Sequence, residues 1–212
     1  MPLYKTILPK KNTNVYIWHI TEPFDELNTQ FLTEKSINRL NGMRSEVHQK
    51  GFLSIRHLLK EAGYTDADLY YNGNGKPHLK DGKHISITHS FTFSGICISD
   101  DEIGIDIEMN RPKIKKIAHK FIGNETRFLQ DENLVEQLTV IWGAKESLYK
   151  IYLYGGISFK KDIPIEAFSI SDAEATGWIK AEDWDKKYRI FFEQLEGFTL
   201  VYAYPFYANT NE

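Results

Sequence analysis

Residues 84–108 read HISITHSFTFSGICISDDEIGIDIE, and this stretch organises the fold that we predict. Isoleucines alternate with small or polar residues in three runs, at 85–87, 96–98 and 103–107. Successive side chains of a strand point to opposite faces, so this period of two predicts strands with one apolar face. The polar residues 99–102 predict a turn, so we expect a central hairpin that includes the strand 103–107.

The sequence on either side of this stretch predicts helices as well as strands. Before it, residues 15–20 (VYIWHI) predict a strand, and helical spacing of apolar residues over 33–62 predicts one long helix, or two with a break near Asn41-Gly42. After it, helical patterns and then four strand-like runs cover residues 114–121, 125–130, 134–149, 165–171, 175–181, 188–195 and 198–204. This order favours an α+β protein with two halves joined near the central hairpin.

Composition narrows the class of protein. The chain has 212 residues, of which 42% are hydrophobic, enough for a substantial core. Its 26 basic and 29 acidic residues give a net charge of −3, which argues against a nucleic-acid partner. The single cysteine, Cys97, excludes an intramolecular disulfide and a Cys-rich zinc site. Without an apolar run near the roughly 18 residues of a membrane span, we expect a soluble, cytoplasmic protein with no membrane partner.

The pentapeptide GIDIE at 104–108 carries two carboxylates on one face of the third strand. Gly104, Asp106 and Glu108 share this face, and the isoleucines point to the opposite one. Two carboxylates about 7 Å apart along a strand can hold a hard divalent cation, particularly Mg²⁺, which takes few protein oxygens and keeps its waters. On the pentapeptide alone, the simpler interpretation is a solvated strand face that carries two acids by chance.

The predicted helix 134–149 leads into a second motif, WGAKESLYK at 142–150. Trp142, Glu146 and Lys150 stand at i, i+4 and i+8, so they lie along one stripe of the helix. A Glu four residues before a Lys is also the ordinary ion pair of a surface helix. The tryptophan on the same stripe favours a face that is packed or that lines a cleft.

Three further features stand out. His89-Ser90 ends a strand, where ligand contacts concentrate, although a lone histidine is more often structural. Gly75-Lys76-Pro77 lies in the turn-rich loop 68–83 and is not a phosphate loop, because Pro77 stands where such a loop needs Ser or Thr. Residues 111–120 (RPKIKKIAHK) hold five Lys or Arg residues and no acid, which fits a solvated face or a docking patch for an acidic partner.

Taken together and in this order, the two motifs resemble the signatures G-x-D-x-E and W-x-x-K-E-x-x-x-K of the 4′-phosphopantetheinyl transferase superfamily. The longer, surfactin-synthetase-activating (Sfp-like) branch is the most similar, over about residues 50–150. This resemblance implies two similar α/β subdomains related by a pseudo-twofold, with the active site in the cleft between them. It implies subdomains at 1–102, for coenzyme A phosphate and adenine contacts, and 103–212, for the metal site and catalytic helix. It also implies a monomer.

The resemblance further implies an activity: transfer of phosphopantetheine from coenzyme A to a serine of an apo acyl or peptidyl carrier protein, with release of 3′,5′-ADP. The implied Mg²⁺ ligands are Asp106, Glu108 and Glu146. The implied catalytic residues are Glu146, Lys150 and Asp106, with Glu146 as base, directly or through a water on the metal. The implied coenzyme A contacts are Lys50, Arg56, Gly75, Lys76, Pro77, His89, Ser90, Lys145 and Lys150, with Arg44 as a weaker candidate. The acidic carrier is expected to dock near residues 111–120.

Two other classes of protein use the same residues. A metal-dependent phosphoesterase or nuclease can be built on these acids, but such nucleases commonly need E-x-K on a strand, whereas Lys145-Glu146 are adjacent on a helix. An inactive carrier-binding homologue is disfavoured because the set of acids and lysines is complete. The sequence does not indicate which carrier is modified.

Overall fold

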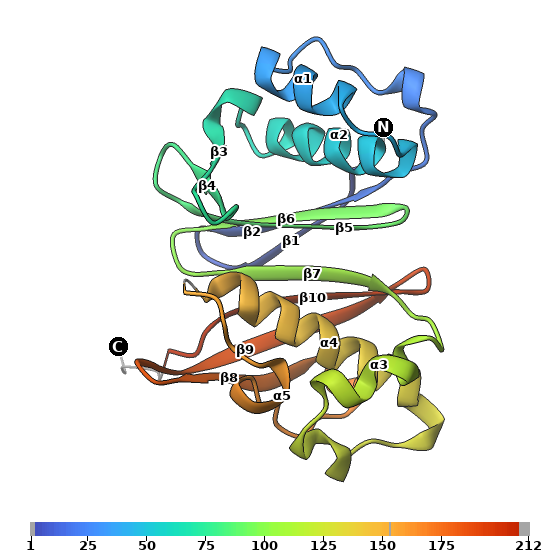
Figure 1. The fold of residues 1–212 in the computed structure, drawn as a ribbon, viewed down its shortest axis with the longest axis vertical. Helices are drawn as coiled ribbons and strands as arrows, with labels where there is room; N and C mark the ends of the chain where they lie inside the picture. The colour runs from blue at the N-terminus through green and yellow to red at the C-terminus, as the bar shows by residue number, and fades with distance from the viewer. Residues whose placement is uncertain (1–2, 153, 208–212) are drawn as a thin grey trace. The chain divides into compact units, whose positions relative to one another are not determined.

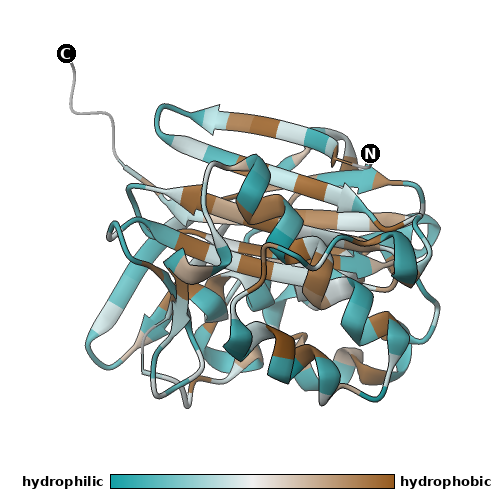
Figure 2. Ribbon diagram, turned by 90° about the horizontal axis from the view of Figure 1, so that it is seen from above, coloured by the Kyte–Doolittle hydropathy of each residue, from teal (hydrophilic) through white to brown (hydrophobic). Residues whose placement is uncertain are grey.

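The structure, a computed structural model, describes residues 3–152 and 154–207. It divides into two compact units, Met1–Asp100 and Asp101–Glu212 (Figure 1), where the sequence analysis placed the boundary at 102/103. Each unit combines a four-stranded sheet with helices, so the predicted α+β class is confirmed. Hydropathy alternates along many of the strands in Figure 2, as the period of two predicts.

The first unit is built on an antiparallel sheet with the strand order β1-β2-β6-β5. Its strands are β1 (Leu3–Lys10), β2 (Thr13–His19), β5 (His84–Ser90) and β6 (Phe93–Ser99). Between β2 and β5 lie α1 (Glu34–Asn41), α2 (Glu46–Glu61) and a separate pair of short strands, β3 (Leu69–Tyr71) and β4 (Pro77–Leu79). The sequence analysis made no prediction for β1.

The helical stretch of the first unit consists of two helices, as one of the two predictions had it. Thr33 caps α1, because its hydroxyl accepts a hydrogen bond from the Ser36 amide at 3.3 Å. The chain then leaves the helix at Gly42 and enters α2 after Ser45. The apolar side of α2, with Ile55, Leu58 and Leu59, packs on buried isoleucines of β5 and β6 and so covers one face of the sheet.

The second unit has the strand order β7-β10-β9-β8, again antiparallel throughout. Its strands are β7 (Gly104–Met109), β8 (Glu174–Ala181), β9 (Trp184–Leu195) and β10 (Phe198–Pro205). Its helices α3 (Ile114–Phe121), α4 (Leu134–Ile151) and α5 (Phe159–Asp162) all lie between β7 and β8 in the chain. Helix α4 packs on β7 and β10 across one face of the sheet (Figure 1).

Three predictions about elements were wrong. Strand β7 is not part of the central hairpin: β5 pairs with β6, whereas β7 pairs with the distant β10, an equally apolar strand. Residues 165–171 contain only an isolated bridge at Ile165, because Ser169 and Asp172 cap a 3-10 turn instead. Residues 125–130 are not a helix, because the chain forms a 3-10 turn at Asn124–Arg127 around the buried Glu125. Among the described residues, no helix is long and apolar enough to cross a membrane.

Candidate active site

The contact between α4 and the sheet depends on two glycines. A Cβ atom on Gly104 would overlap the carbonyl oxygen of Ser147, so the helix backbone lies directly on β7. A Cβ on Gly143 would come within 2.7 Å of Cγ2 of Val201 on β10. No side chain can fit at Gly104 without a shift of the helix, which is a physical reason for the glycine in GIDIE.

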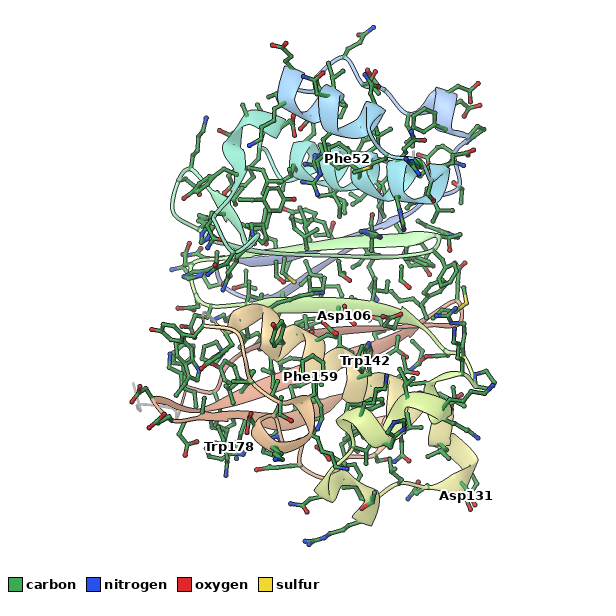
Figure 3. All side chains as sticks on the ribbon, in the orientation of Figure 1. Phe52, Asp106, Asp131, Trp142, Phe159 and Trp178 are labelled. Atoms are coloured by element: carbon green, nitrogen blue, oxygen red, sulfur yellow. The ribbon has the colours of Figure 1, made fainter. Side chains whose placement is uncertain are left out.

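This close approach brings the motif strand and the motif helix together. The Nζ atom of Lys150 donates to Oδ1 of Asp106 at 2.9 Å and to the carbonyl oxygen of Ile105 at 2.7 Å. Asp106, labelled in Figure 3, is only 6% exposed, so the simpler interpretation of a solvated strand face does not hold for it. The side chain of Lys150 keeps 28% of its surface exposed.

Glu146 lies one helical turn before Lys150 and is electrostatically coupled to the same group. Burial is the main reason why the pKa of Glu146 rises to about 7, and the charges of Asp106 and Glu108 raise it further. Lys150 opposes this shift, but less strongly. The structure therefore couples Asp106 and Glu108 of the first motif to Glu146 and Lys150 of the second.

The chemistry of these donors fits a magnesium ion. Three coupled carboxylates repel one another, and a divalent cation would relieve that repulsion. Within residues 3–152 and 154–207, no three His, Cys, Asp or Glu side chains are gathered into a ready cage for a metal. Mg²⁺ commonly binds through one or two carboxylates together with waters and substrate phosphates, so it does not need such a cage.

Lys145, one of the expected contacts of coenzyme A, does not join this group. Its side chain is fully buried, and its Nζ atom donates to the carbonyl oxygens of Phe121 and Phe159 at 2.8 and 2.9 Å. The third bond, at 2.6 Å, goes to Oε1 of Glu125. All three ammonium protons are therefore used inside the protein. Sequence reasoning missed Glu125, because no spacing rule links two residues that are 20 apart.

Trp142 packs on the side of α4 that faces α3 and α5. Its ring makes an edge contact with Phe121, with ring centroids 5.1 Å apart, and a tilted contact with Phe159 at 5.5 Å. Figure 3 shows Trp142 and Phe159 beside each other. The tryptophan of the motif thus fastens α3 and α5 to α4, in agreement with the prediction of a packed face.

In the first unit, His89 lies at the exposed end of β5 against α2. A Cβ on Gly51 would be 3.3 Å from the His89 ring, so the ring packs directly on the helix backbone. The His48 ring lies 6.4 Å away, centroid to centroid. Lys50 on the same helix forms an ion pair with Glu46 at 3.0 Å. His89, Lys50 and the neighbouring Ser90 are thus accessible, and their contacts with coenzyme A stay a prediction.

Arg56, another of the expected contacts of coenzyme A, is buried in the first unit. It is only 5% exposed, its Nε donates to Oδ1 of Asp66 at 3.2 Å, and its guanidinium lies 3.5 Å from the centre of the Phe52 ring. Burial raises the pKa of Asp66, but hydrogen bonds from Thr33 and Ser36 and the charge of Arg56 lower it overall. Arg56 is therefore part of the core of its unit. Arg44, before α2, is exposed.

The loop with Gly75, Lys76 and Pro77 is ordered by its own hydrogen bonds. The side-chain oxygen of Asn72 accepts from the amides of Asn74 and Lys76, both at 3.0 Å. Gly75 has a φ of +77°, a left-handed conformation that favours glycine. Lys76 and Pro77 are half-buried, and Pro77 begins β4. Their predicted place at the adenine ring stays a prediction.

The basic residues of 111–120 are joined by two lysines from α5. Lys160 donates to the carbonyl oxygen of His119 at 3.4 Å, so α5 lies beside α3. We call the exposed members the basic surface: Arg111, Lys113, Lys115, Lys116, His119, Lys120, Lys160 and Lys161. Sequence reasoning missed the last two because they are 40 residues further along the chain.

Comparisons with known proteins point to the second unit. Over 117 aligned residues the chain is 32% identical to enterobactin synthase component D of Salmonella typhimurium, and the alignment covers 51% of this chain and 48% of that protein. The chain thus spans about half the length of the curated relative it matches. Residues 102–203, which carry both motifs and the site around Asp106 and Glu146, match the model of the 4′-phosphopantetheinyl transferase superfamily.

Proposed function

We propose that the protein transfers the 4′-phosphopantetheine group of coenzyme A to a serine of an apo carrier protein, as an enzyme of the Sfp-like branch. The observation that carries this proposal is the coupled group of Asp106, Glu108, Glu146 and Lys150 where α4 meets β7. The match of residues 102–203 to the superfamily gives the group its reaction class.

In this proposal Asp106, Glu108 and Glu146 would hold Mg²⁺, directly or through its waters. When bound, the ion would neutralise charge on the pyrophosphate of coenzyme A and orient it. Asp106 and the carbonyl of Ile105 fix the ammonium of Lys150, which would neutralise a phosphate oxygen.

Glu146 serves as the base for the attacking serine. The serine oxygen forms a bond to the phosphorus that carries pantetheine, the bond from that phosphorus to 3′,5′-ADP breaks, and ADP leaves with the electron pair. Glu146 takes the hydroxyl proton, directly or through a water. Without a metal, burial and the nearby carboxylates raise the pKa of Glu146 to about 7, and Mg²⁺ bound to these carboxylates would lower it again.

The first unit would supply the remaining contacts to coenzyme A. We assign the 3′-phosphate to His89, with Ser90 and Lys50 nearby, and the adenine ring to the loop of Gly75, Lys76 and Pro77. The exposure of His89 and the order of the loop support these assignments.

The carrier protein is the second substrate. The basic surface gathers its cations from α3 and α5 of the unit that holds the catalytic group. An acidic carrier is complementary to that charge, and such complementarity steers a partner and fixes its orientation. We propose that the carrier docks there.

The test is incubation of the full chain with Mg²⁺, coenzyme A and a panel of apo acyl and peptidyl carriers, followed by mass spectrometry. We expect one carrier to gain one phosphopantetheine group, and Glu146→Gln to abolish the gain. Glu136→Gln, on the first turn of the same helix, is the matched control and should remain active. Normal turnover by Glu146→Gln would refute the assignment. Hydrolysis of coenzyme A or another phosphoester without transfer would favour the phosphoesterase alternative.

A further inference from the structure

The second unit contains a buried ion pair that the proposed reaction does not use. Lys145 and Glu125 are 0% and 2% exposed, with Nζ and Oε1 2.6 Å apart. A charge in an apolar interior is costly unless it is paired and hydrogen-bonded, so a pair that is this deeply buried must have all its hydrogen bonds made.

The hydrogen bonds of the pair are complete and reach five segments. Glu125 accepts from the amide of Ile165 at 3.1 Å through Oε1 and from the amide of Gly123 at 2.7 Å through Oε2. Lys145 donates to the carbonyl oxygen of Phe121, the last residue of α3, and to that of Phe159, the first residue of α5. Lys145 and Glu125 together therefore connect α4 with α3, the turn after it, α5 and the chain that follows α5.

The segments tied by the pair are those that carry the basic surface. Lys115, Lys116 and Lys120 are exposed on α3, and Lys160 and Lys161 on α5. Lys145 precedes Glu146 directly, and the two side chains leave α4 in directions about 100° apart. The helix thus presents Glu146 towards β7 and Lys145 towards α3 and α5.

We propose that Lys145 and Glu125 are positioning residues, which hold α3 and α5 on α4 so that the basic surface keeps a fixed place relative to Glu146. The proposal rests on the proposed function of that surface as the carrier dock. In this proposal Lys145 affects how the carrier docks and does not contact coenzyme A. Removal of either partner leaves the other charge buried and unpaired, whereas removal of both charges does not.

Three variants of the full chain test this proposal: Lys145→Met, Glu125→Gln, and the double variant. In the double variant the amide oxygen of the new glutamine still accepts a backbone N–H, and no charge is buried. The first measurement is amide hydrogen exchange at Gly123 and Ile165, which needs no activity. We expect exchange about tenfold faster in Lys145→Met and partial recovery in the double variant. Amides of α2 in the first unit are the internal control.

The second measurement is kinetic. We expect the KM for the apo carrier to rise about tenfold in Lys145→Met and to recover in the double variant, with coenzyme A affinity by calorimetry within about twofold throughout. Lys150→Met is the comparison, in which coenzyme A affinity should fall.

The outcomes separate the inference from the proposed function. A folded double variant that loses coenzyme A affinity about tenfold would make Lys145 a ligand contact and overturn the inference. Unchanged exchange at Gly123 and Ile165 in Lys145→Met would overturn it as well. If the unmodified chain transfers nothing to any carrier, the proposed function fails, while the exchange experiment still decides whether the pair holds α3 and α5.

Discussion

The two units follow the same course but differ where helix meets sheet. In the first, β2 leads to α2, and the last strand, β6, returns to pair with β2. In the second, β7 leads to α4, and the last strand, β10, returns to pair with β7. Each long helix also carries one cation of a buried ion pair, Arg56 with Asp66 and Lys145 with Glu125.

The two units differ in the kind of side chains found where the long helix contacts the sheet. In the first unit it is apolar, with Ile55 of α2 packed in the same cluster as Trp18 and Ile96 of the sheet. In the second, Gly104 lets α4 lie directly on β7, and Asp106, Glu146 and Lys150 meet at this contact. A group of charges in a half-buried place opposes folding, so this contact is expected to contribute less stability than the apolar contact of the first unit.

The largest effect on stability is expected at the buried ion pairs, a feature that the two units share. Arg56→Met should lower the free energy of unfolding by about 3–5 kcal/mol, because Asp66 is left buried without its cation. Chemical denaturation measures this change. Lys60→Met, an exposed cation on the same helix, is the control and should change stability by less than about 0.5 kcal/mol. Equal effects of the two variants would mean that the Arg56 pair is not structural.

The second prediction concerns the close contact of α4 with β7, by which the second unit differs from the first. Gly104→Ala should destabilise the protein by about 1–3 kcal/mol or more and abolish transfer, because α4 must move off β7 and take Glu146 with it. Gly73→Ala is the matched control, since a Cβ there meets no atom within 4 Å. Denaturation and the carrier assay report the two effects. A fully active Gly104→Ala would show that the close approach does not position the site.

The sequence predicts which residues of the two motifs meet better than it predicts the surroundings of the buried lysine and arginine. The period of a strand and the pitch of a helix place Asp106 and Glu108 on one face and Glu146 and Lys150 on one stripe, whereas their roles come from the family resemblance. Local rules also contain a warning about Lys145, which shares its side of α4 with Ile141 and Leu148 at i−4 and i+3. The family resemblance outweighed that warning.

Local spacing also indicates that Arg56 is buried. Arg56 stands three and four residues after Leu53 and Phe52, on the apolar side of α2. The spacing therefore indicates burial, whereas the family resemblance implied a contact with coenzyme A.

The pairing of β7 with β10 lies beyond any local rule, because about 90 residues of chain separate the two strands and either could pair with other apolar strands.

The third prediction concerns pH and the first unit. Hydrogen bonds and Arg56 lower the pKa of Asp66 in the folded state, so its ionised form stabilises the fold. That contribution is complete above the unfolded pKa of about 3.9 and is lost as the pH falls through the lower folded value. The unmodified chain should therefore lose stability on acidification below pH 4 more steeply than Asp66→Asn. Unfolding at pH 7 and pH 3 compares them, and parallel profiles would contradict the role of Asp66.

The smallest effect on stability is expected for Lys50, whose side chain is 24% exposed, so this variant separates a loss of binding from a loss of folding. Lys50 pairs with Glu46 one turn earlier on α2, where Glu46 is 64% exposed, so Lys50→Met should cost less than about 0.5 kcal/mol. If Lys50 contacts coenzyme A, calorimetry should nevertheless show weaker binding, and more so at low salt, where an exposed charge is least screened. Arg56→Met should show the reverse, a large loss of stability without a specific loss of affinity. Unchanged affinity in Lys50→Met would remove Lys50 from the proposed contacts and leave His89 and the loop at Lys76 to hold the phosphate and the adenine.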